Sequence, residues 1–117
     1  MTHPHADAGG NFIDTSDAYQ QGQSELAIGA FVTANRDDFV IASKYSRGSR
    51  PEAGIAARGA HRKAMIQSVE ASLKRLKTDR IDLYLNYWAT HPWCMFAVQW
   101  VQGERSARFF SSCAHVR

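Results

Sequence analysis

Short apolar runs alternate along the chain with longer segments of helical periodicity. Residues 11–15, 39–43 and 81–85 are mostly apolar, contain β-branched or aromatic side chains, and are flanked by turn residues. Runs of this length and composition are typical of buried strands. We therefore predict three strands, and residues 39–43 give the clearest pattern.

Two helices are predicted between these strands. In residues 61–77 the apolar side chains recur at spacings of four, four and three, which places them on one helix face: Met65, Val69, Leu73 and Leu76. The other helix covers residues 24–35. Ser24 is its expected N-cap, because a serine hydroxyl can accept a hydrogen bond from an amide of the first turn. Glu25 then lies near the positive end of the helix dipole.

The order strand, helix, strand, helix, strand predicts a parallel sheet covered by helices, and therefore the α/β class. Residues 46–60 contain three glycines and one proline, so we expect a loop there. After Trp88 neither strand nor helix periodicity persists. Residues 95–117 are expected to be an irregular tail, either disordered or forming a short helix around 95–102.

The net charge of +3 is unevenly distributed. Residues 1–43 carry six acidic residues and one basic residue, a net charge of −5, whereas residues 44–117 carry five and thirteen, a net charge of +8. Such asymmetry can attract nucleic acid or phosphate. The basic residues are scattered, and no aromatic side chains interleave with them in a binding motif. We therefore favour a solvated helix face with a basic tail, and expect no nucleic-acid partner.

The sequence does not indicate a membrane-spanning, secreted or metal-binding protein either. The apolar runs are only a few residues long, so we expect no membrane span. The first residues have neither the basic nor the apolar region of a secretion signal. Cys94 and Cys113 provide no disulfide framework and no four-ligand zinc site. We expect a cytoplasmic protein without a metal.

Three chemically active side chains fall where the predicted parallel strands end. Asp14 ends the first strand, Tyr19 follows in the next loop, and Lys44 ends the second strand. Functional residues of parallel α/β folds gather at the carboxyl ends of strands. A phenol is a poor acid at neutral pH, but a neighbouring ammonium stabilises its anion, and a carboxylate can hold that ammonium. The alternative is structural: a turn cap, a loop aromatic and a solvated lysine.

Four separated segments carry a resemblance to a known family: GGNFIDTSDAY, GQSE, FVIASKYS and HRKAMIQSVEASLKRLKTDRIDLY. In this order and spacing, residues 8–84 resemble the N-terminal part of the aldo-keto reductases. They are most similar to the branch that includes aryl-alcohol-dehydrogenase-like and potassium-channel-β-subunit-like proteins. The resemblance implies a partial (β/α)8 TIM barrel with about three βα units, which correspond to strands two to four of the family.

The resemblance also implies an NADPH-dependent oxidoreductase that acts on a small aldehyde or ketone. By motif, Tyr19 corresponds to the acid that protonates the carbonyl oxygen, and Lys44 to the lysine that tunes it. Asp14 corresponds to the aspartate that partners the lysine, and is also a candidate contact to the cofactor. The family's fourth residue, a histidine, falls at Tyr87. A phenol can donate one hydrogen bond but is no equivalent of an imidazole.

Length is the other departure from the family, because a complete barrel needs about 250 residues and this chain has 117. We expect residues 1–94 to form a partial reductase domain, truncated and inactive alone, and residues 95–117 to be an unmatched tail. A non-catalytic reductase-like binding or regulatory module is the alternative. Three parallel strands leave two unpaired sheet edges, through which copies of the chain can associate.

Overall fold

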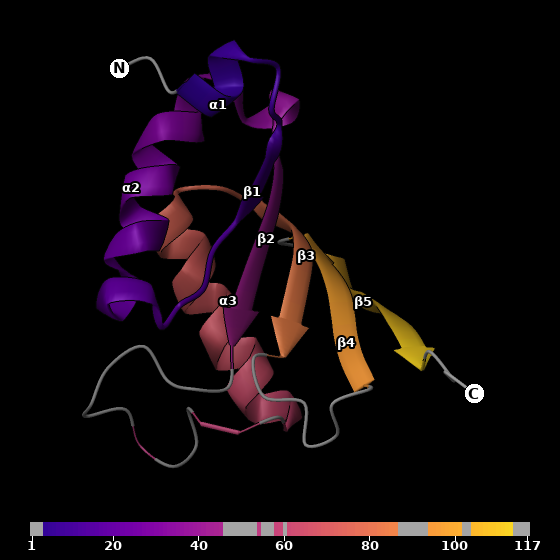
Figure 1. The fold of residues 1–117 in the computed structure, drawn as a ribbon. Coiled ribbons are helices and arrows are strands. Elements are labelled where there is room, and N and C mark those ends of the chain that lie inside the picture. The colour runs from indigo at the N-terminus through magenta and orange to yellow at the C-terminus, as the bar shows by residue number, and fades with distance from the viewer. Residues whose placement is uncertain are drawn as a thin grey trace.

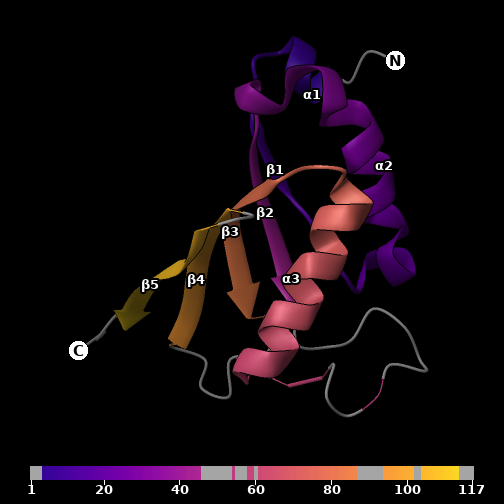
Figure 2. The ribbon, with the colours of Figure 1, turned by 180° about the vertical axis from the view of Figure 1, so that it is seen from behind.

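The computed structural model describes residues 4–45, 54, 58–59, 61–86, 94–101 and 104–113. Its elements in chain order are α1 (Pro4–Asp7), β1 (Phe12–Asp14), α2 (Gln23–Val32), β2 (Val40–Tyr45), α3 (Arg62–Leu76), β3 (Arg80–Asn86), β4 (Cys94–Val101) and β5 (Glu104–Cys113). Short 3-10 helices, Tyr19–Gly22 and Thr33–Asp38, flank α2. Helix α3 lies behind β2 and β3 in Figure 1 and in front of them in Figure 2, with α2 beside it.

The strands form one sheet in the order β1-β2-β3-β4-β5 (Figure 1). β1, β2 and β3 run parallel, with Asp14 beside Ala42 and Lys44 beside Leu85. The α/β class and the three predicted strands are therefore confirmed. Parallel strands joined through helices are the repeating unit of a βα barrel, so this part of the chain has the architecture of consecutive barrel units.

The prediction for the tail is wrong where the structure describes it. Residues 94–101 form β4 rather than a short helix, and β5 follows as its antiparallel partner. β4 also pairs antiparallel with β3. Its sequence, CMFAVQWV, contains aromatic and β-branched residues that favour strands, and the pairing satisfies backbone groups on the edge of β3. One of the two edges expected to be unpaired, that of β3, is thus occupied by β4. Association of copies through open sheet edges stays a prediction.

Helix α2 begins at Gln23, and its N-cap is Gly22, two residues before the predicted N-cap Ser24. Gly22 has a left-handed φ of 89°, and a Cβ there would lie 2.9 Å from Cδ of Arg75. Both features favour glycine. The Ser24 hydroxyl instead shares a hydrogen bond of 2.9 Å with the Thr15 hydroxyl, so it ties the helix to the chain that leaves β1. The helix ends at Val32, before the predicted end.

Helix α3 confirms the predicted amphipathic helix. His61 is its N-cap, and its Nδ1 accepts a hydrogen bond from the Ala64 amide at 3.2 Å. Lys77, with a left-handed φ of 51°, ends it. The apolar face of α3 is buried, and the core it joins consists of Val32, Ile41, Tyr45, Met65, Val69, Leu73, Leu76, Ile81 and Tyr84.

Close packing of α2 against the end of α3 depends on Gly29, which is buried in α2. A Cβ at this position would lie 2.6 Å from the carbonyl carbon and oxygen of Leu76, and 2.7 Å from the carbonyl oxygen of Arg75. These neighbours are backbone atoms and cannot rotate away. The absence of a side chain at residue 29 therefore sets the distance between the two helices.

We expect Gly29→Ala to lower the free energy of unfolding by about 1–3 kcal/mol through overpacking, although glycine to alanine normally stabilises a helix by about 1 kcal/mol. Urea unfolding of the 117-residue chain measures the change. Ala27→Gly, at an exposed position of the same helix, is the control for propensity alone. A Gly29→Ala variant more stable than the wild type would contradict the close contact.

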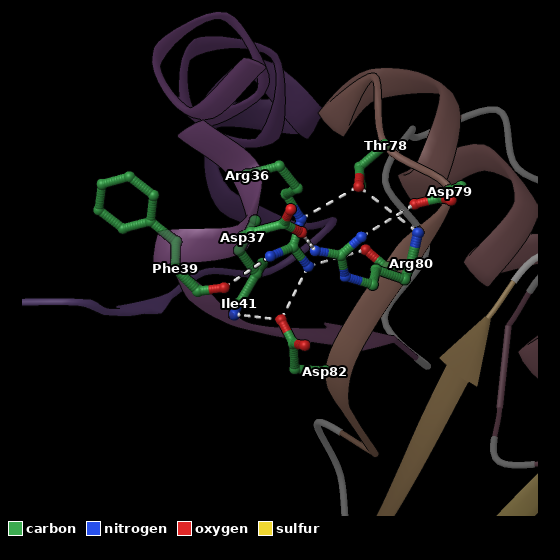
Figure 3. Close-up of polar contacts among 8 residues, drawn as sticks. All are labelled: Arg36, Asp37, Phe39, Ile41, Thr78, Asp79, Arg80 and Asp82. Carbon is green, nitrogen blue, oxygen red and sulfur yellow. Dashed lines mark hydrogen bonds and ion pairs between the residues drawn. The ribbon is translucent and has the colours of Figure 1, made fainter. Parts of the chain in front are cut away.

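A polar network ties the beginnings of β2 and β3 together (Figure 3). Arg36 donates to the carbonyl oxygens of Phe39 at 2.6 Å and Arg80 at 3.0 Å. It also donates to the Thr78 hydroxyl at 3.0 Å and to Asp82 Oδ2 at 2.7 Å. The planar guanidinium suits this arrangement, because it presents several donors in fixed directions.

Asp82 completes the network, because its Oδ2 also accepts from the Ile41 amide at 2.8 Å. A side chain on β3 thus satisfies a backbone donor near the start of β2. Arg80 makes outer contacts, a salt bridge to Asp37 and another to Asp79 at 3.5 Å (Figure 3). The network lies at the amino ends of the parallel strands, the end that contributes stability in βα barrels.

We expect Arg36→Lys to lower the free energy of unfolding by about 1.5–3 kcal/mol, because an ammonium cannot reproduce the fork of hydrogen bonds. Arg80→Lys is the matched control. Its partner Asp37 is 90% exposed, and exposed ion pairs contribute about 0–1 kcal/mol. Urea unfolding of both variants checks the comparison, and equal losses would contradict the central position of Arg36.

Candidate active site

Lys44 is the next-to-last residue of β2, and its side chain reaches the end of β1. Its Nζ donates to Asp14 Oδ1 at 2.6 Å and to the Thr15 carbonyl oxygen at 3.0 Å. The Lys44 side chain is 17% exposed and that of Asp14 is 52% exposed. The ion pair therefore lies at the rim of the sheet, where a bound molecule can reach the carboxylate.

Tyr19 joins this pair from the 3-10 helix that follows β1. Lys44 Nζ lies 5.3 Å from the centroid of the Tyr19 ring, within the range of a cation–π interaction. The two residues after Tyr19, Gln20 and Gln21, have left-handed φ values of 49° and 56°, a conformation that costs energy in non-glycine residues. The structure thus brings Asp14, Tyr19 and Lys44 together, while their catalytic roles stay predictions.

Tyr87, the fourth predicted site residue, lies outside the described residues, and so does most of the predicted loop at 46–60. Within the described part of the chain, no group of His, Cys, Asp or Glu side chains is arranged to hold a metal ion. None of the helices described there has the length and apolar character needed to cross a membrane.

A buried layer of polar side chains lies behind the rim, centred on Glu25. This glutamate is fully buried, at 0% exposure. Its Oε1 accepts from the Ser43 hydroxyl at 2.5 Å, and its Oε2 accepts from Arg75 Nε at 2.6 Å. A buried carboxylate needs both a counter-charge and hydrogen bonds to offset the loss of water. Arg75 and Ser43 supply them, from α3 and β2.

Asp17 lies next to this pair and is also buried. Burial raises the pKa of Asp17 to about 6, and the negative charge of Glu25 adds to the rise, whereas Arg75 and a hydrogen bond from the Ser16 hydroxyl oppose it. The Asp17 amide donates to the Lys44 carbonyl oxygen at 3.2 Å. The loop that carries Tyr19 is thereby attached to the end of β2.

Tyr84 closes the layer on the β3 side. Its ring stacks on Tyr45, with centroids 5.1 Å apart. Burial raises the pKa of Tyr84 well above its ordinary value, and the charges of Asp17 and Glu25 raise it further. The Tyr84 phenol therefore stays neutral at any physiological pH and adds no charge to the two carboxyl groups nearby.

This buried layer was not predicted from the sequence. One signal was present: Ser68 and Ser72 interrupt the apolar face of the 61–77 helix, and Arg75 follows Ser72 by three residues. Residues at this spacing are neighbours on a helix, and Arg75 Nη2 does donate to the Ser72 hydroxyl at 3.3 Å. Polar side chains beside an apolar face indicate a buried polar partner but do not say which residue it is.

Comparison with known proteins decides the family. The model of the aldo/keto reductase family matches residues 1–98. The chain belongs to the aldo/keto reductase family. As a family member it is 45% identical over 87 residues to norsolorinic acid reductase B of Dothistroma septosporum, a match that covers 68% of this chain and 22% of that protein. It is 45% identical over 92 residues to aldo-keto reductase ausK of Emericella nidulans, covering 72% of this chain and 23% of that one.

Solved structures give the same result for this member of the family. It is similar to an aldo-keto reductase from Klebsiella pneumoniae in complex with NADPH, with 34% sequence identity and a TM-score of 0.58. That match covers 70% of this chain and 25% of the other. The chain thus spans about a quarter or less of the length of these relatives. Three βα units are fewer than half of those in an eight-unit barrel.

We expect stability to fall between about pH 4 and pH 6, because the folded state keeps a proton on Asp17 that the unfolded chain releases near its ordinary pKa of 3.8. A shift of this size contributes about 2–3 kcal/mol to the free energy of unfolding at pH values below the unfolded pKa. This contribution is absent above the folded pKa. Asp17→Asn should remove most of this slope. Urea unfolding across this pH range measures it, with exposed Asp38→Asn as control. A wild-type slope in Asp17→Asn would contradict the assignment.

Proposed function

We propose that this chain carries the proton-donating part of a nicotinamide-dependent carbonyl reductase. The observation that supports the proposal is the position of Lys44 Nζ, 2.6 Å from Asp14 Oδ1 and 5.3 Å from the centre of the Tyr19 ring. An acid group, an amine and a phenol from three separate segments converge at the carboxyl ends of β1 and β2. This is the end of a βα barrel where active sites are built.

Each of the three side chains has a chemical role in the proposal. The Tyr19 hydroxyl donates its proton to the substrate carbonyl oxygen as negative charge develops there. The positive charge of Lys44 stabilises the phenolate that remains. Asp14, together with the Thr15 carbonyl oxygen, holds the ammonium of Lys44 in place. When bound, the reduced nicotinamide supplies the hydride.

We base the proposed cofactor and substrate class on the relatives. A similar structure was solved with NADPH bound, and we propose the same cofactor for the complete site. The exposed Asp14 carboxylate is chemically suited to accept a hydrogen bond from a hydroxyl of that cofactor. A small aldehyde or ketone is the proposed substrate. Because the chain spans 22% of norsolorinic acid reductase B, we propose that the reductase reaction needs further barrel strands.

The test places this chain's site in a complete barrel. The 87-residue matched segment of the Dothistroma septosporum relative is replaced by the counterpart from this chain, and consumption of NADPH is followed with an aromatic aldehyde. The chimera should turn over, and Tyr19→Phe should lower kcat by about 10²–10⁴-fold. NADPH affinity, measured by fluorescence titration, should change little. The isolated 117-residue chain should show no turnover.

Two outcomes would contradict the proposal. A Tyr19→Phe chimera with the wild-type kcat would show that Tyr19 is not the acid. Tight NADPH binding by a chimera that never turns over would favour the non-catalytic binding module, the alternative to which Tyr87 in place of histidine points. Phe12→Leu, at an exposed position of β1, serves as the control variant.

A further inference from the structure

We infer that Glu25, acting with Arg75, is a positioning residue that sets the place of Lys44 in the site. The inference deepens the proposed function, because it takes Lys44 to be a functional group of the site. It concerns a buried carboxylate behind the site, on the opposite side of β2 from the lysine amine. Neither Glu25 nor Arg75 is expected to touch the substrate.

Ser43 and Lys44 are neighbouring residues on β2. Successive side chains of a strand point to opposite faces, so Ser43 points toward the helices when Lys44 points to the other face. The Ser43 hydroxyl donates to Glu25 Oε1 at 2.5 Å. Any movement of this part of β2 toward or away from the helices changes that contact, and moves Lys44 at the same time.

Glu25 itself has little freedom to move. It is fully buried, and its second oxygen is held by Arg75 Nε at 2.6 Å. Arg75 in turn packs against the position where a Cβ of Gly22 would be, at the start of α2. The ion pair therefore links α2 and α3, and the Ser43 hydroxyl attaches the end of β2 to this rigid pair.

Lys44 is then fixed from three directions. Its backbone is held through Ser43 on the helix side, and its carbonyl oxygen accepts from the Asp17 amide at 3.2 Å. Its Nζ is held by Asp14 and Thr15. The first of these contacts, from Ser43 to Glu25, involves a buried charge. Breaking a hydrogen bond to a buried charge costs more free energy than breaking one to a neutral group. This makes Ser43–Glu25 the contact that sets the position of the strand end.

The test measures the reactivity of the Lys44 amine rather than the rate of the reductase reaction. Acylation of lysine amines in the folded 117-residue chain is followed by mass spectrometry, with exposed Lys63 and Lys74 as internal references. In the wild type, Lys44 should react more slowly than both. Ser43→Ala should raise the Lys44 rate at least threefold while the two reference rates stay the same, and Ser43→Thr, which retains the hydroxyl, should restore most of the protection.

Controls separate positioning from general loosening. Ser68→Ala removes another buried hydroxyl from α3 and should leave the Lys44 rate unchanged. If Ser43→Ala does not fold, Glu25→Gln is read in the same way, because it keeps the shape and removes the charge. Equal Lys44 rates in the wild type and in the folded variant would overturn the inference, as would an equal rise in Ser68→Ala. None of these results depends on turnover, so the proposed reaction can fail while the inference stands.

Discussion

The buried carboxylate of Glu25 is the constraint on which the arrangement of the helices and the site depends. A charge with no exposed surface is tolerated only where fixed partners replace water, and Glu25 has two, Arg75 and Ser43. They come from α3 and β2, whereas Glu25 belongs to α2. These three elements must therefore meet at one point, and the apolar core between them forms in a single arrangement that agrees with it.

At the amino ends of the strands, Arg36 has a comparable role. Its guanidinium donates hydrogen bonds to two backbone carbonyl oxygens and to the Asp82 carboxylate (Figure 3). Near the opposite end of the strands, Glu25 accepts hydrogen bonds in the same way. Apolar residues such as Ile41 and Ile81 fill the space between. With both ends of β2 fixed by polar contacts, the loop after β1 can hold Gln20 and Gln21 in left-handed conformations and leave Tyr19 exposed without weakening the core.

Elements whose pattern is local were predictable from the sequence. The 61–77 helix and the strands at 39–43 and 81–85 show their own periodicity, and Asp14 and Lys44 could be paired because parallel strands end at the same edge. Ser24 was misassigned because the choice between Ser24 and Gly22 as N-cap depends on Arg75 and Thr15, which are distant contacts. Glu25 finds its partners 18 and 50 residues away, a separation that no local pattern encodes.

The antiparallel pairing of β4 with β3 has a consequence for completing a barrel. The outer side of β3 offers a single row of amides and carbonyls, and β4 occupies it. A strand arriving parallel to β3, as barrel closure requires, needs that same row. The two arrangements are mutually exclusive, so the β4–β5 pair competes with barrel closure and must be displaced before a parallel strand can pair with β3.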